Sequence, residues 1–194
     1  VLLIVTLIIF AKTRKFQKDS LVRTVTNYLT FFVIFEALIG AVIVIFEWVG
    51  LNSSLPRIIA VPIHLVNTFG LLGCYAILYK ILDENIEEII SMFNKNFIFI
   101  SSLFLLSGAT GSIAALADVL FPSASFIEGF LADFDRTSEI LTRLRILHPI
   151  VSSALSLVLY VYSVRINKKY NIRVKPLQTL IFVAVFLGFL NVLS

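Results

Sequence analysis

The sequence is poor in charge and in metal-binding residues. Only 14% of its 194 residues are Asp, Glu, Lys or Arg, against about 25% in soluble globular domains. The single cysteine, Cys74, excludes an internal disulfide and a Cys-x-x-Cys metal site. The only histidines are His64 and His148, and no acidic pair or Cys/His cluster accompanies them. These absences argue against a zinc site or a two-metal centre.

Apolar residues are abundant, at 59% of the chain. They form blocks of about 20 residues separated by charged clusters, a pattern typical of helices that cross a membrane repeatedly. We therefore predict an all-α integral membrane protein, a transmembrane helix bundle, with spans at 25–49, 56–80, 97–120, 147–166 and 176–194. The apolar run 1–11 is about half as long as a span, which predicts a partial helix at an internal start point. The last span is expected to be truncated in the same way.

The lysines and arginines are distributed unevenly between the predicted loops. Most fall at 12–24, 80–95 and 165–175, and the alternate loops hold only Arg57, Arg136, Arg143 and Arg145. Cytoplasmic loops carry an excess of such residues, so we predict a multi-pass membrane protein whose loops at 12–24, 80–95 and 165–175 are cytoplasmic. Both histidines then lie toward the outer face. The net charge of +4 reflects this topology, and no nucleic-acid partner is expected.

Both histidines lie in apolar segments beside arginines. An ionisable ring inside a bilayer is costly and needs a reason. A neutral imidazole can bind a metal through one nitrogen while the other donates a hydrogen bond, and heme iron needs only one or two protein ligands. We therefore predict His64 and His148 as ligands of heme iron, with Arg57, Arg143 and Arg145 pairing with heme propionates. The alternative is a structural histidine that is hydrogen-bonded against a neighbouring helix.

Other polar residues have simpler interpretations. Glu36 lies near the middle of a span, and is either a proton-relay or substrate-side carboxyl or a protonated glutamate bonded to a neighbouring helix. Asp118 is expected to pair with an arginine, and Cys74 to fill a small buried space. The stretch 81–96 predicts a short surface helix with a solvated acidic face at 83–88. The loop 121–145 predicts a short amphipathic helix that ends at its arginines.

Three motifs occur in a recognisable order: HLVNTF at 64–69, GATGSIAALADVLFP at 108–122 and LRILHP at 144–149. Together they resemble the bacterial and archaeal branch of the heme A synthase family, the cytochrome oxidase assembly proteins. The resemblance implies a location in a prokaryotic plasma membrane. Residues 35–40 and 188–192 are weaker features of the same resemblance. Glu36 stands where the family commonly has glutamine, and the loop 121–145 lacks the cysteine pair that some members carry.

The resemblance implies a protein of two similar four-helix halves, each able to hold a heme between two histidines. Residues 1–80 would be the end of the first half and residues 97–194 most of the second. His64 then resembles the second ligand of the first half and His148 the first ligand of the second half. Their partner ligands would lie outside this sequence, so the two histidines would serve different hemes.

The reaction implied by the resemblance is oxidation of the C8 methyl of heme O to the formyl of heme A. One half would hold heme O as the substrate, and the other would hold a heme b cofactor. The implied partners are the lipid bilayer, a heme O synthase and an electron donor. The alternative function is a heme-binding electron carrier or assembly protein of the same architecture that does not catalyse this reaction. No catalytic residue is assigned.

Overall fold

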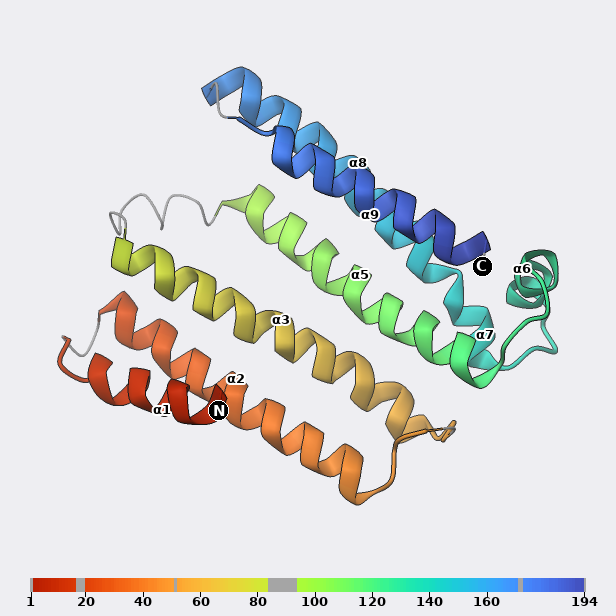
Figure 1. Ribbon diagram of the computed structural model, residues 1–194, viewed down its shortest axis with the longest axis horizontal. Coiled ribbons are helices and arrows are strands. Elements are labelled where there is room, and N and C mark those ends of the chain that lie inside the picture. The colour runs from red at the N-terminus through yellow and green to blue at the C-terminus, as the bar shows by residue number, and fades with distance from the viewer. Residues whose placement is uncertain (1, 17–19, 51, 84–93, 171–172, 194) are drawn as a thin grey trace. The chain divides into compact units, whose positions relative to one another are not determined.

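The computed structural model describes residues 2–16, 20–50, 52–83, 94–170 and 173–193 (Figure 1). Every regular element in these ranges is a helix, which confirms the all-α prediction. The internal contacts divide the chain into two compact units, Val1–Ile98 and Phe99–Ser194. Each unit is described by itself.

The first unit contains α1 (Leu2–Thr13), α2 (Leu21–Ile45) and α3 (Leu55–Asp83), and α2 packs against both of its neighbours. The α2 helix begins earlier than the predicted span because Ser20 caps it. The Ser20 hydroxyl accepts a hydrogen bond from the Arg23 backbone N–H at 3.4 Å, satisfying a donor that the helix itself leaves unpaired. The α3 helix continues through Pro62.

The apolar core of the first unit lies between the N-terminal half of α2 and the C-terminal half of α3. Its buried members recur every three or four residues, which places them on one face of each helix: Val22, Val25, Leu29, Val33, Leu71, Cys74, Leu78 and Ile81. The burial of Cys74 confirms that it fills a small space in a core. The α1 helix is joined to α3 by a 2.6 Å hydrogen bond between the Thr6 and Tyr75 hydroxyls.

The second unit contains α5 (Lys95–Leu120), α6 (Phe126–Phe134), α7 (Ile140–Arg145), α8 (Leu147–Tyr170) and α9 (Lys175–Leu193). The loop 121–145 thus holds two helices rather than the one predicted. The α6 helix forms because Ser125 accepts from the Glu128 N–H at 3.3 Å, while the Glu128 carboxyl accepts from the Ala124 N–H at 3.1 Å. This reciprocal arrangement is close to a capping box.

The chain turns at Ile146, between α7 and α8. Pro149 lies in the first turn of α8, where backbone N–H groups have no partner within the helix, so proline is tolerated there. The turn immediately before His148 agrees with the irregular backbone that Pro149 predicts. His148 consequently lies at the very start of a long helix.

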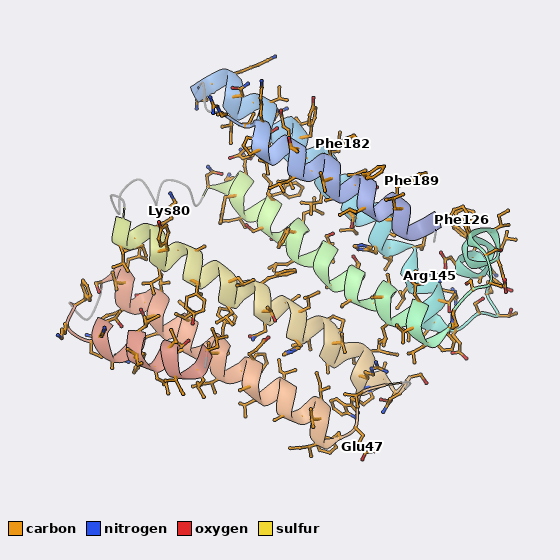
Figure 2. The ribbon with its side chains drawn as sticks, viewed as in Figure 1. Glu47, Lys80, Phe126, Arg145, Phe182 and Phe189 are labelled. Atoms are coloured by element: carbon orange, nitrogen blue, oxygen red, sulfur yellow. The ribbon has the colours of Figure 1, made fainter. Side chains whose placement is uncertain are left out.

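Four stretches are long and apolar enough to cross a membrane: α2, α3, α5 and residues 140–169, which combine α7 and α8. The α1 and α9 helices are apolar but shorter in their described parts. Phe182 and Phe189 on α9 point outward (Figure 2), with exposed fractions of 71% and 60%. Such exposure of apolar side chains suits a lipid environment, because lipid tails are as apolar as they are. The chain is a multi-pass helical membrane protein.

The predicted surface helix at 81–96 lies largely outside the described residues. The α3 helix extends to Asp83, and the description resumes at Asn94, just before α5. The acidic face predicted at 83–88 is likewise outside the described side chains.

Candidate functional site

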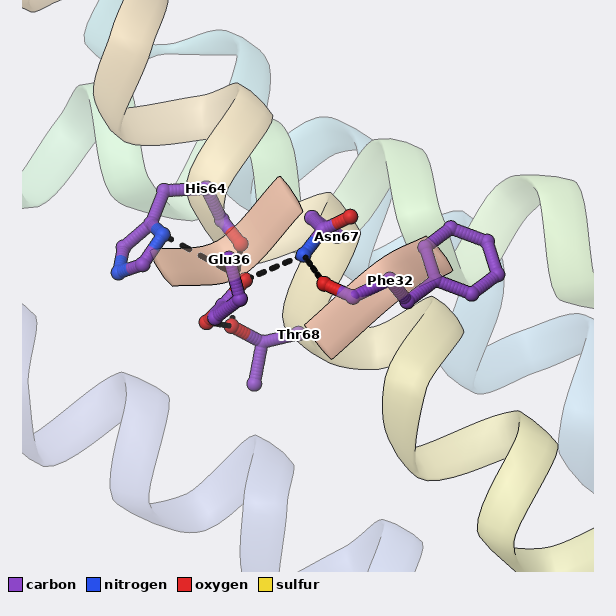
Figure 3. A network of polar contacts seen from close by, with 5 residues as sticks. All are labelled: Phe32, Glu36, His64, Asn67 and Thr68. Atoms are coloured by element: carbon purple, nitrogen blue, oxygen red, sulfur yellow. Dashed lines mark hydrogen bonds and ion pairs between the residues drawn. The ribbon is translucent and has the colours of Figure 1, made fainter. Parts of the chain in front are cut away.

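His64 belongs to a polar network between α2 and α3 (Figure 3). Glu36 Oε2 lies 3.5 Å from His64 Nδ1 and 2.5 Å from Asn67 Nδ2, and Glu36 Oε1 lies 2.5 Å from the Thr68 hydroxyl. His64, Asn67 and Thr68 come together because residues three and four apart share one face of a helix. The Asn67 amide also donates to the Phe32 carbonyl at 3.0 Å. The network therefore ties His64 to the opposite helix.

The α2 and α3 helices approach closely beside this network because Gly70 has no side chain. A Cβ atom there would lie 2.9 Å from the Phe32 ring. The missing side chain lets Phe32 pack against α3, which brings its backbone carbonyl within reach of Asn67.

The His64 ring has one nitrogen facing the network and one facing away from it. Nδ1 is buried, and its 3.5 Å separation from Glu36 is longer than a good hydrogen bond, so it has no formal partner in the described chain. Nε2 lies on the opposite edge of the ring (Figure 3) and contacts no polar group of the described residues. The side chain is 37% exposed, so Nε2 is accessible to a ligand.

His148 is held differently, between α5 and α8. Its Nδ1 lies 3.2 Å from the Ser107 carbonyl oxygen and 3.1 Å from the Ser152 hydroxyl, which is itself 2.8 Å from the Ser107 hydroxyl. A carbonyl oxygen can only accept, so the contact with Ser107 favours the tautomer that carries its proton on Nδ1. In that tautomer Nε2 keeps its lone pair, and it has no polar partner among the described side chains.

Gly111 provides the space for this ring. A Cβ at Gly111 would lie 2.9 Å from His148 Cε1 and 3.1 Å from Nδ1. Small residues such as Gly111 let another group approach the backbone of a helix closely. In the structure, the group that approaches Gly111 is the His148 imidazole.

Arg145 is engaged at all three guanidinium nitrogens. Nε donates to Asp133 at 2.9 Å, Nη1 to Asp118 at 2.7 Å and Nη2 to the Gly129 carbonyl at 2.8 Å. This confirms that Asp118 pairs with an arginine. Arg145 thereby fastens α6 to the end of α5 (Figure 2).

The other two predicted arginines differ from Arg145. Arg57 Nη1 donates to the Gly50 and Asn52 carbonyls, both at 2.6 Å, and so stabilises the loop that joins α2 to α3. Its Nε is buried with no hydrogen-bond partner in the described chain. Arg143 is exposed at the end of α7. The pairing of these three arginines with propionates stays a prediction.

The available metal-binding side chains suit heme iron, which can be bound by one histidine at a time. The described residues contain no group of three or more His, Cys, Asp or Glu side chains that could hold a metal ion. Heme iron needs only one or two axial ligands because the porphyrin supplies the other four. His64 and His148 lie in different units, and neither Nε2 forms a hydrogen bond with the described residues. The chemistry of each therefore fits the role of an axial ligand.

A comparison with known protein families shows to which family the chain belongs. The family model described as cytochrome oxidase assembly protein matches residues 1–194, the whole sequence. The chain belongs to this family. Its membership confirms the resemblance to the heme A synthase family that the three sequence motifs indicated.

Curated proteins are similar in sequence to part of the chain. The protoheme IX farnesyltransferases of two Thermus thermophilus strains are each 31% identical to it over 157 residues, which is 76% of this chain and 24% of the relative. The chain thus spans about a quarter of the length of these relatives. No solved structure matches the chain significantly.

Sequence reasoning identified Glu36 but missed its pairing with His64. One of the two interpretations of Glu36 was a carboxyl bonded to a neighbouring helix, and its contacts with Asn67 and Thr68 agree with that arrangement. The available signal was the polar triplet at 64, 67 and 68, which needed a partner at similar depth in another helix. Glu36 was the one acidic residue near the middle of the preceding span.

Proposed function

We propose that this member of the cytochrome oxidase assembly protein family is a heme A synthase. It oxidises the C8 methyl of heme O, its substrate, to the formyl of heme A, with heme b as the cofactor of its other half. The proposal rests on one feature that both intramembrane histidines have in common. Each turns Nδ1 toward protein groups and has no hydrogen bond to Nε2 among the described residues, as expected of an axial ligand whose second nitrogen is oriented by the protein.

The two units contribute to separate sites in this proposal. His64 serves as an axial ligand in the first half and His148 in the second. The heme b, when bound, supplies one-electron redox chemistry at its iron. The protein's own part is to hold each imidazole and to bind the propionates.

Among the arginines, Arg143 is best placed for a propionate because it is exposed and has no ion-pair partner among the described residues. Arg57 keeps one unpaired nitrogen for the same role. Arg145 would have to exchange a carboxylate partner for a propionate. The distribution of basic residues supports a plasma-membrane location with both sites toward the outer face.

The relatives add support from their names. They are protoheme IX farnesyltransferases, and a farnesylated heme is the kind of substrate that the proposed oxidation requires. The resemblance to part of such an enzyme supports a role for this chain in the heme modification that follows farnesylation. A heme O synthase is accordingly the proposed source of substrate, with an electron donor completing the set of partners.

The test uses the purified full-length protein, expressed with and without a heme O synthase. Heme is quantified as the pyridine hemochrome and identified after extraction by reverse-phase chromatography. We expect bound heme b in both preparations, and heme A only when heme O is supplied. Protein without any heme would overturn heme binding. Bound heme without heme A would favour the carrier or assembly function instead.

A further inference from the structure

The described chain surrounds its two histidines with different chemistry. His148 Nδ1 faces a backbone carbonyl and a serine hydroxyl, whereas His64 Nδ1 faces the carboxyl of Glu36 from another helix. A carboxyl inside a bilayer is expensive and calls for a reason. The apolar core packs α2 against α3 through residues 22–33 and 71–81, and Glu36 lies outside it.

The Phe32 carbonyl fixes the direction of the Asn67 amide. Because that carbonyl can only accept, the atom 3.0 Å from it must be the Asn67 NH₂ group rather than the amide oxygen. The same NH₂ group then directs its second hydrogen to Glu36 Oε2. Oε2 is therefore held as a hydrogen-bond acceptor.

The acceptor Oε2 is the atom that faces His64 Nδ1. A ring nitrogen that faces an acceptor is stabilised when it carries the proton, which leaves the lone pair on Nε2. The Thr68 hydroxyl lies near both Glu36 Oε1 and the His64 carbonyl, at 2.5 and 3.0 Å. It thus fixes the second carboxyl oxygen from the helical turn that bears the histidine.

We propose that Glu36, oriented by Asn67 and Thr68, is a positioning residue that holds the His64 imidazole in the Nδ1–H tautomer with Nε2 directed away from α2. The proposal rests on the proposed heme binding for its purpose. It concerns Glu36 alone, because Nδ1 of His148 faces a backbone carbonyl and a serine hydroxyl rather than a carboxyl. A small rotation of the ring converts the 3.5 Å separation into a hydrogen bond once Nε2 is bound.

The first experiment uses full-length apo-protein labelled with ¹⁵N-histidine. Nitrogen chemical shifts report the tautomer of each neutral imidazole, and the His64 signal is assigned from its loss in His64→Gln. We expect the Nδ1–H form for His64, a reversal to Nε2–H in Glu36→Leu, and recovery of Nδ1–H in Glu36→Gln, whose amide oxygen can accept. The His148 signal should remain unchanged in both variants. An unchanged His64 tautomer in Glu36→Leu would overturn the proposal without bearing on heme binding.

The second experiment records electron paramagnetic resonance spectra of the ferric holoprotein, because the g-values of a low-spin heme depend on the orientation of its axial imidazoles. Glu36→Leu should shift the signal of one heme and leave the other unchanged, and Glu36→Gln should restore it. Thr68→Val removes only the hydroxyl and should produce a smaller shift of the same signal, which guards against misfolding of the leucine variant. Wild-type spectra in both Glu36→Leu and Thr68→Val would contradict the positioning role. Absence of heme from the wild type would instead refute the proposed function.

Discussion

His64 faces α2 in a network formed by the side chains of Glu36, Asn67 and Thr68. His148 instead contacts a backbone carbonyl of α5 and packs closely against Gly111. The first arrangement depends on the chemistry of individual side chains, each of which can be replaced. The second depends mainly on packing, because the Ser107 carbonyl is present whatever residue occupies that position. The first site should therefore respond to changes in polarity, and the second to changes in volume.

The largest expected effect is the loss of a heme when either histidine is removed. In the full-length protein, His64→Ala should abolish one heme signal and His148→Ala the other, because the resemblance to the heme A synthase family assigns the two residues to different halves. The pyridine hemochrome per protein, together with the visible spectrum, measures this loss. Ile63→Ala and Ile150→Ala, at exposed neighbouring positions, are the matched controls. Loss of the same heme in both histidine variants would mean that they share one site.

The next largest effects are expected at the arginines beside the histidines, where replacing Arg145 should reduce stability more than replacing Arg57. Arg145→Ala leaves the Asp133 carboxylate, which is 9% exposed, without its cation, and we expect a loss of about 3 kcal/mol in unfolding free energy. Arg57→Ala removes hydrogen bonds to loop carbonyls and should cost about 1 kcal/mol. Denaturation in detergent measures both, with the exposed Arg143→Ala as the control. Equal losses at 57 and 145 would show that the Asp133 contact adds nothing to stability.

Gly111→Ala tests the dependence of the second site on volume. The added Cβ would force the His148 ring to move, so we expect a loss of about 1–3 kcal/mol and a changed spectrum of one heme. Gly73→Ala is the control, because a Cβ there meets nothing within 4 Å and alanine favours a helix by up to about 1 kcal/mol. If Gly111→Ala behaves like Gly73→Ala, close packing does not position His148.

The smallest effect is expected from Ser152→Ala. It removes a hydroxyl from His148 but keeps the Ser107 carbonyl, so stability should fall by about 1 kcal/mol while both hemes remain bound. The neighbouring exposed Ser153→Ala should change neither property. Loss of heme from Ser152→Ala would show that the second site also depends on a replaceable side chain.

Much of the fold follows from the pattern of the sequence. The apolar blocks predicted membrane helices because each block matches the thickness of a bilayer. The α6 helix in the loop 121–145 was not predicted. It has only nine residues, and its start depends on the reciprocal hydrogen bonds of Ser125 and Glu128. The pairing of Asp118 with an arginine was predictable because a carboxylate near the membrane surface needs a cation. Its particular partner was not, because Arg145 lies far along the chain.

The sequence by itself determined that this is a helical membrane protein of the heme A synthase family with two intramembrane histidines, because hydropathy and motifs are properties of contiguous residues. The tertiary structure decided which groups face those histidines. Glu36 and His64 are separated by a helix end, a loop and two turns of α3, and no local pattern sets the register in which α2 meets α3. That register follows from the packing of the apolar core and from the contact between Gly70 and Phe32, which together place the carboxyl opposite the imidazole.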